Sequence, residues 1–213
     1  MNRDSPSSAP GNLQDAILDA TETLIGRHGS DGVSLRQISL AAGSANNSAV
    51  HYYFKNKDGL IRETIRRRSS SVDQRRRDVL GKLLKKGFEK DTRAIMEVLL
   101  RPIADETNKE GECSYAAFLL ALRVFNDISY WRTIADSPEI TRNLYEMLQD
   151  SLQPVPAEIV ELRFLTAFSL FLMSVVDWDQ SRSFSRNLIS SREAYLQHSL
   201  DFATAGMQAP WSP

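Results

Sequence analysis

Residues 34–60 read SLRQISLAAGSANNSAVHYYFKNKDGL, and this stretch decides the fold of the N-terminal part of the chain. Ser34 followed by Gln37 has the spacing of a capping box, which predicts a helix that begins there. Gly43 ends that helix, because glycine adopts the conformation of a sharp turn at little cost. A second short helix then follows at about residues 47–54, and three residues suit its N-cap: Asn46, Asn47 and Ser48.

The second of these helices has small polar residues at its start and an aromatic and basic end, HYYFKNK at 51–57. Compact donors and acceptors can read base edges in the major groove of DNA. Hydroxyls, lysines and helix N-termini bind phosphates. The pattern therefore predicts a helix-turn-helix that binds double-stranded DNA.

Two segments of this stretch, AAG at 41–43 and AVHYYFKNKDGL at 49–60, resemble the signature of the TetR family of one-component repressors. The sequence departs from the commonest signature twice: the turn after Gly43 is one residue longer, and His51 stands in place of the first tyrosine. The resemblance covers about residues 12–60. It implies an N-terminal helix-turn-helix domain on an all-α dimerisation and ligand-binding domain, and a repressor released from its operator by a small molecule.

Two sets of residues are expected to contact the operator. The expected base contacts lie at or near the start of the second helix: Asn46, Asn47, Ser48 and Tyr52. The expected phosphate contacts are Ser34, Tyr53 and Lys57. The resemblance implies that two of these residues contact the DNA backbone: Ser34, at the start of the preceding helix, and Lys57, the lysine after the phenylalanine. Packing within the domain is the alternative for Tyr53 and His51.

Charge is distributed unevenly along the 213 residues, although the formal net charge is only −1. Residues 1–87 hold 15 Lys and Arg against 9 Asp and Glu, whereas residues 88–213 hold 11 against 18. A nucleic-acid contact is therefore expected in the N-terminal part. The sole cysteine, Cys113, excludes an internal disulfide framework and is compatible with a reducing cytoplasm. The N-terminus lacks the apolar core of a signal peptide, and the longest uncharged apolar run, 164–176, is too short to cross a bilayer.

The whole chain is expected to be all-α, with about nine helices: a three-helix helix-turn-helix domain followed by a larger C-terminal helical bundle. Residues 1–11 are rich in Ser, Pro and Gly and are expected to form a disordered arm. Residues 12–60 form the DNA-binding domain, and a helix at 57–86 connects it to the ligand-binding and dimerisation domain at 87–213.

The middle of this connecting helix, RRRSSSVDQRRR at 66–77, has no apolar stripe. The two arginine triplets suggest a second DNA contact. The alternative, which we favour from the sequence, is a solvated bridge between the two domains.

The last two predicted helices, at about 157–179 and 190–205, are expected to form a homodimer interface. The first is apolar on nearly all sides between residues 164 and 176. It therefore has more apolar surface than a single neighbouring helix can cover. Ser190 and Glu193 have capping-box spacing and predict the start of the second. The alternative is that all of this apolar surface is intramolecular core.

A pocket for a small apolar or aromatic effector is expected in the middle of the C-terminal domain. Its candidate lining consists of Met96, Leu100, Tyr115, Phe118, Leu122, Phe125, Trp131, Met147 and Phe168. Three residues are possible polar contacts for the effector: Tyr115, Arg123 and Asn126. Ordinary core packing is the alternative for each.

The sequence shows no constellation typical of catalysis or metal binding. The three histidines, at 28, 51 and 198, are scattered singly, and no Gly-rich phosphate loop follows a strand. We therefore expect no enzyme activity, metal or cofactor, and a cytoplasmic protein with no membrane partner. Two other hypotheses stay open: a small-molecule-binding helical protein or enzyme with an incidental helix-turn-helix, and an architectural DNA binder without an effector.

Overall fold

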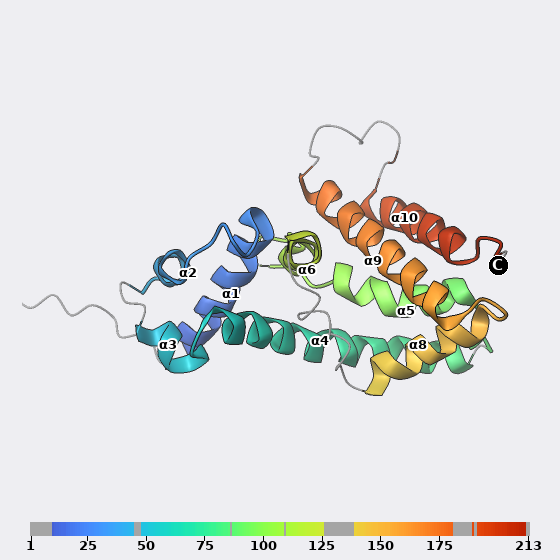
Figure 1. Cartoon of the computed structure of the whole chain (residues 1–213), viewed down its shortest axis with the longest axis horizontal. Coiled ribbons are helices and arrows are strands. Elements are labelled where there is room, and N and C mark those ends of the chain that lie inside the picture. Colours follow the sequence, from blue (N-terminus) through green and yellow to red (C-terminus); the bar gives the residue numbers. More distant parts are fainter. Residues whose placement is uncertain are drawn as a thin grey trace, which may run out of the picture.

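The computed structural model describes residues 10–44, 48–85, 87–108, 110–125, 139–180, 189 and 191–211 (Figure 1). The regular elements in these ranges are nine α-helices, without a strand, which confirms the all-α prediction. They are α1 (Pro10–His28), α2 (Leu35–Ala41), α3 (Ser48–Phe54), α4 (Lys57–Lys85), α5 (Thr92–Ala104), α6 (Ser114–Phe125), α8 (Glu139–Ser151), α9 (Ala157–Gln180) and α10 (Arg192–Met207).

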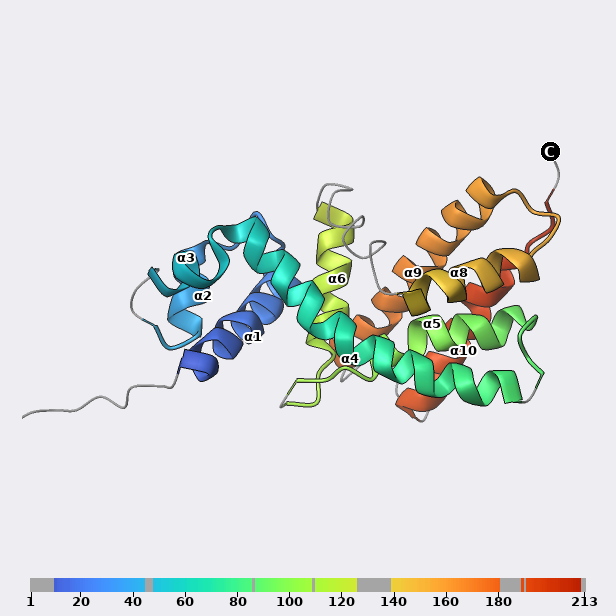
Figure 2. The same ribbon diagram turned by 90° about the horizontal axis from the view of Figure 1, so that it is seen from below.

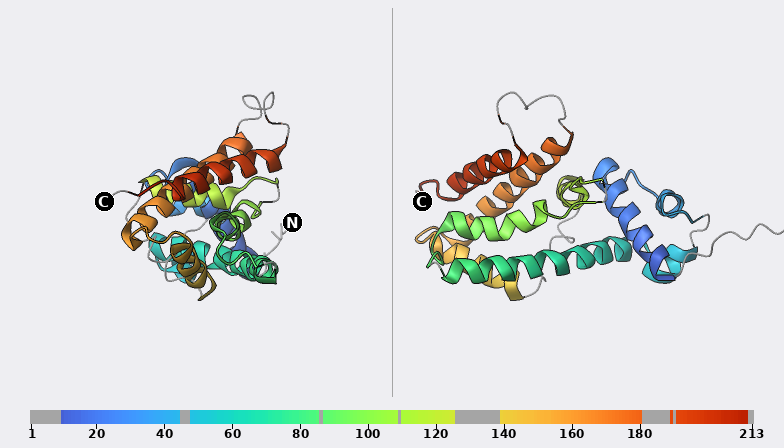
Figure 3. Two further views of the ribbon diagram at one scale, coloured as in Figure 1. Left: turned by 90° about the vertical axis from the view of Figure 1, so that its right-hand side faces the viewer. Right: turned by 180° about the vertical axis from the view of Figure 1, so that it is seen from behind.

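The molecule is elongated, with α1, α2 and α3 gathered at one end (Figures 1 and 2). The 29-residue helix α4 starts beside α3 and runs to the opposite end, where it lies against α5 and α8. Helices α9 and α10 pack side by side as the outer layer of the C-terminal bundle (Figure 3). A single continuous helix thus joins the two ends of the molecule.

The N-terminal helices close around one apolar core. Ser34 is the N-cap of α2, and both hydrogen bonds of the capping box with Gln37 are present, as predicted. Gly29 and Gly43 end α1 and α2 in the left-handed conformation, with φ of 72° and 78°. The core side chains from the four helices are Ile17, Leu18, Ile25, Ile38, Val50, Phe54, Leu60 and Ile61, each at most 5% exposed.

Helix α1 also packs against α6 of the C-terminal bundle, and the two backbones approach closely at Gly26. A Cβ atom on Gly26 would lie 3.1 Å from Ala117 Cβ and 3.1 Å from the backbone nitrogen of Phe118. Glycine is therefore the residue that lets the DNA-binding end and the bundle meet without an intervening layer of side chains.

The C-terminal helices begin and end largely where their polar residues predict. Asp91 caps α5, and Pro102 lies inside this helix, two residues before its end at Ala104. The predicted cap Ser190 lies outside the described residues, and α10 instead has Ser191 as its N-cap, whose hydroxyl accepts from the backbone nitrogen of Ala194 at 3.1 Å.

Glu193, predicted to complete a capping box with Ser190, instead binds Arg101 on α5. Hydrogen bonds, first from Arg101 and then from Gln197, lower the pKa of the Glu193 carboxyl to about 2. The tertiary ion pair therefore uses the side chain that the local pattern had assigned to the cap.

Among the described helices, α9 alone is long and apolar enough to cross a membrane, by length and composition. Core helices of soluble proteins pass the same test. Here α9 packs along α10 and against α6, and Asp179 near its end accepts a hydrogen bond of 2.6 Å from the backbone nitrogen of Cys113. These contacts identify α9 as a helix of the bundle.

Candidate nucleic-acid interface and its connection to the bundle

Helix α3 presents one buried face and one exposed face. Val50 and Phe54 are buried against the neighbouring helices, and Tyr53 packs half-buried against the same core. Tyr52 is 82% exposed, and its ring meets that of Tyr53 edge-on at a centroid distance of 5.1 Å. An aromatic hydroxyl side chain held by its neighbour but open to solvent is available to a macromolecular ligand.

The turn between α3 and α4 is held by local polar contacts. A ring nitrogen of His51 donates to the carbonyl oxygen of Lys55 at 3.0 Å, and Lys55 has a φ of 67°. Asn56 Oδ1 accepts from the backbone nitrogen of Gly59 at 2.8 Å. A Cβ on Gly59 would lie 2.2 Å from the carbonyl oxygen of Phe54, so only glycine fits there. His51 thus stabilises the strained residue that ends α3.

The predicted DNA contacts occupy different environments. Ser48 and Tyr52 lie exposed on α3, whereas Asn46 and Asn47 lie outside the described residues. Ser34 is exposed, but its hydroxyl donates to Gln37 Oε1 at 2.7 Å and accepts from the backbone nitrogen of Gln37 at 3.3 Å. Tyr53 combines exposure with packing. The contact assignments themselves stay predictions.

Lys57 has partners that the sequence did not indicate. Its ammonium group donates to the carbonyl oxygen of Val33 at 2.6 Å and also to that of Ser30. Both carbonyls belong to the loop between α1 and α2. Lys57 therefore ties the start of α4 to this loop, and the phosphate contact predicted for it would have to use the remaining N–H donor of the ammonium.

A buried ion-pair network joins α4 to the rest of the molecule. Glu22 on α1 is 1% exposed, and both its oxygens accept from Arg68, at 2.7 and 2.9 Å. Ser114 at the start of α6 donates to the same carboxylate. Arg68 also reaches Glu106, 4% exposed, at 3.2 Å, and Ser71 donates to Glu106 at 2.6 Å. One carboxylate of the DNA-binding domain is thus shared by α4 and α6.

A second buried pair lies further along α4. Asp73 and Arg76 are 1% and 8% exposed, and Val72 beside them is 2% exposed. The interpretation of residues 66–77 as a solvated bridge is therefore wrong for its inner face. Arginine can be buried when carboxylates and carbonyls pair with its guanidinium group, so an absent apolar stripe does not imply exposure.

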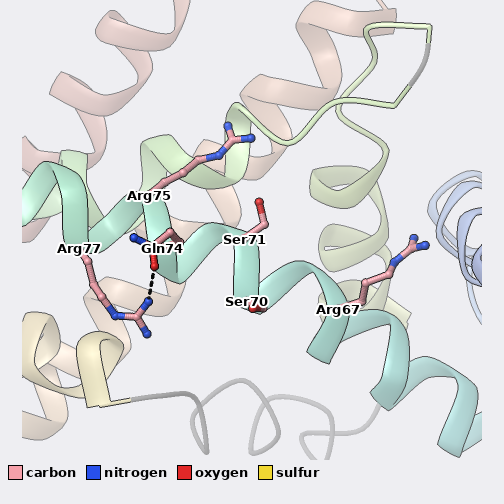
Figure 4. Close-up of a pocket in the computed structure, with 6 residues that line it drawn as sticks. All are labelled: Arg67, Ser70, Ser71, Gln74, Arg75 and Arg77. Atoms are coloured by element: carbon pink, nitrogen blue, oxygen red, sulfur yellow. Dashed lines mark hydrogen bonds between the residues drawn. The ribbon is translucent and has the colours of Figure 1, made fainter.

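The outer face of the same segment lines an open, polar groove of about 530 Å³, formed by Arg67, Ser70, Ser71, Gln74, Arg75 and Arg77 (Figure 4). The three guanidinium groups point in different directions. Arg67 binds Asp19 at 2.7 Å, Arg75 binds Glu106 at 3.2 Å, and Arg77 binds Gln74 at 3.1 Å. Because these cations diverge and already have partners, the groove is not a convergent anion site.

The residues predicted to line an effector pocket are mostly core residues. Met96, Leu100, Tyr115, Phe118, Leu122 and Phe168 are each at most 5% exposed, and Met147 is half-buried. The Tyr115 and Phe118 rings stack at a centroid distance of 6.3 Å. Trp131, Asn126 and the side chain of Phe125 lie outside the described residues. The ligand-binding role of these residues stays a prediction.

The sequence analysis missed the buried charges, although a signal was present. Glu22 lies between Leu18 and Ile25 on the apolar stripe of α1, and a charge at such a position requires a partner in the core. Arg76 lies on the stripe of α4 that also carries Val72 and Leu83.

Comparison with known proteins agrees with this architecture. Residues 17–64 match the family model for bacterial regulatory proteins of the tetR family. A TetR family transcription regulator from Marinobacter aquaeolei VT8 superposes with a TM-score of 0.60 at 17% identity, over 92% of this chain and 95% of that one. A TetR-family regulator from Rhodococcus sp. gives 0.50 at 16% identity, over 92% and 99%. No curated protein sequence matches the chain.

A three-helix helix-turn-helix domain mounted on an all-α bundle defines a DNA-binding transcriptional regulator. Residues 17–64 match the DNA-binding domain of the tetR family, and the chain as a whole shares the fold of TetR-family regulators.

The environments of Tyr52 and Lys57 predict opposite mutational effects. Tyr52→Ala should leave the free energy of unfolding unchanged, because the side chain is exposed, and should weaken specific operator binding by ~1–3 kcal/mol. Lys57→Met should lower the free energy of unfolding by ~1–3 kcal/mol, because two loop carbonyls lose a charged donor. Chemical denaturation and fluorescence anisotropy with labelled operator measure the two effects. Unchanged operator affinity in Tyr52→Ala would remove this residue from the interface.

Proposed function

We propose that this regulator is a repressor that leaves its operator when a small apolar or aromatic ligand binds the C-terminal bundle. The observation that carries the proposal is the buried Glu22 carboxylate, shared by Arg68 on α4 and Ser114 on α6. A rearrangement of the bundle that moves either helix also moves α1, on which α2 and α3 are packed. We infer a cytoplasmic protein that acts by binding, without a catalytic, metal or cofactor site.

Release requires that the ligand favours one of two conformations. A ligand shifts the equilibrium only by its differential affinity for the DNA-binding and the released form, so tight binding alone does not produce induction. Helix α4 is suited to report the difference, because its first turns pack on the DNA-binding domain and its last turns pack on α5 and α8. A change in its direction alters the position of the recognition helix α3.

The operator test addresses repression and release together. Purified protein should select a fragment from the DNA flanking its own gene, and a compound that raises the melting temperature should lower the affinity for that fragment at constant salt. Binding isotherms at several salt concentrations separate specific from electrostatic binding. If every stabilising compound leaves operator affinity unchanged, release by an effector is refuted and an architectural DNA binder explains the fold better.

We propose that α9 and α10 form the interface of a homodimer. Leu162 and Met173, on one face of α9, are 62% and 51% exposed, and Phe202 on α10 is 68% exposed. The opposite faces of both helices are buried against each other and against the bundle. A second copy is the occupant that fits, because two half-sites related by a two-fold axis need two recognition helices.

A charge on this surface should separate the protomers. Phe202→Glu should shift the protein to a species of 24.0 kDa in sedimentation velocity at micromolar concentration, because a dimer would bury two carboxylates. Phe88→Glu is the matched control, since Phe88 is also exposed, at 46%, but follows the far end of α4. A wild-type protein that sediments only as a monomer contradicts the dimer directly.

Removing the shared carboxylate should weaken the connection between effector and operator. Glu22→Gln should lower the free energy of unfolding by ~3–5 kcal/mol, because Arg68 is left as an incompletely paired buried charge. It should also reduce the ratio of operator affinities measured without and with effector. Glu63→Gln is the control. It breaks the exposed ion pair between Glu63 and Arg66, both on α4, and such a pair contributes ~0–1 kcal/mol. Equal affinity ratios in the two variants would exclude Glu22 from the coupling.

A further inference from the structure

Asp73 and Arg76 place two charges inside the C-terminal bundle. They lie one turn apart on α4 and are 1% and 8% exposed. Arg76 donates to partners on three helices: to the carbonyl oxygen of Leu99 on α5 at 2.7 Å, to Asp73 Oδ1 at 3.0 Å and to the hydroxyl of Thr141 on α8 at 2.9 Å. Three helices therefore meet at this pair.

The two oxygens of the Asp73 carboxylate differ in their bonding. Thr141 donates its hydroxyl hydrogen to Oδ1 at 3.1 Å, the same oxygen that accepts from Arg76. Oδ2 is buried and has no hydrogen-bond partner among the residues that the structure describes. A buried carboxylate oxygen without a donor is costly, and native proteins rarely keep one without a reason. A pair that served only stability would be expected to place Thr141 and Arg76 on different oxygens.

The helices that meet at this pair also bury apolar side chains. Leu99 and Leu100 on α5 and Leu144 on α8 are each at most 1% exposed. Tyr115 on α6 is also close: burial is the main cause that raises the pKa of its hydroxyl, and the charges of Arg76 and Asp73 act on it as well. A buried acceptor where α4, α5 and α8 meet, among helices that carry apolar core residues, can orient a mainly apolar ligand through one polar group.

We propose that Asp73 Oδ2 is the polar anchor of the effector site and accepts a hydrogen bond from an N–H or O–H group of the effector. This inference rests on the proposed release by a ligand and names the ligand's chemistry: an apolar body that carries a donor, such as an amine or alcohol. Carboxylates are excluded as anchoring groups, because their oxygens would face the unpaired oxygen of Asp73. The anchor lies on α4, five residues beyond Arg68. A bound ligand therefore acts on the helix whose Arg68 binds Glu22 of α1.

Four probes of similar size test the donor requirement: para-fluorobenzylamine, para-fluorobenzyl alcohol, para-fluorotoluene and para-fluorobenzoate. Fluorine NMR titration of the full-length protein should show the amine and the alcohol binding about tenfold more tightly than the toluene, and the benzoate most weakly. In Asp73→Asn the amide N–H₂ group replaces the acceptor, so the preference for donors should disappear while binding of the toluene is kept.

Thr141→Val is the matched control. It removes a hydrogen bond to the same carboxylate but leaves Oδ2 intact, so it should keep the preference for donors even if it lowers the melting temperature. If Asp73→Asn does not fold, the ranking of the four probes on the wild-type protein decides. Donor probes that bind no better than the toluene, or not at all, overturn the inference, as does an unchanged preference in Asp73→Asn.

Operator affinity measured with the same probes separates this inference from the proposed function. A compound that releases the operator equally well from wild type and Asp73→Asn overturns the anchor and leaves release by a ligand standing. Donor-dependent binding that leaves operator affinity unchanged supports the anchor and counts against release.

Discussion

The structure depends on one buried carboxylate. Glu22 belongs to the first helix of the DNA-binding domain, yet its hydrogen-bond donors come from α4 and α6. The Glu22 carboxylate is only 1% exposed and stays charged in the core only while these donors bind it. The three helices α1, α4 and α6 therefore keep fixed positions relative to one another. Their relative positions could otherwise vary, because apolar contacts are not directional. The network therefore fixes the orientation of one domain on the other, which apolar packing alone would leave less well defined.

The elements of the DNA-binding domain were predictable because their determinants are local. The capping box at Ser34, the left-handed glycine at position 43 and the inward-facing Val50 and Phe54 follow from the identities of residues a few positions apart. The same holds for Asp91 as the cap of α5. Local rules of this kind do not depend on the partner helices, and the family match to residues 17–64 covers the region where they are densest.

The parts that the sequence did not reveal depend on distant partners. Arg68 and Glu22 are 46 residues apart, and Lys57 reaches carbonyls 24 and 27 residues away. Charge and spacing within α4 cannot tell an arginine paired inside the core from one in water. A similar competition decided the start of α10, where the side chain of Glu193 binds Arg101 across the bundle. The side-chain pairs of the candidate site depend on such distant partners, so they were less predictable than the fold.

The contact at Gly26 has a consequence for how displacement passes through the molecule. Where helices meet through side chains, rotamer changes can absorb shifts of an ångström or two before either backbone responds. At Gly26, α1 has no side chain, and it meets only the Ala117 methyl group and the backbone of α6. A movement of α6 toward α1 is therefore resisted by hard-core repulsion between main chains and is passed on at nearly its full size. The junction therefore has little compliance in which a small rearrangement of the bundle could be lost.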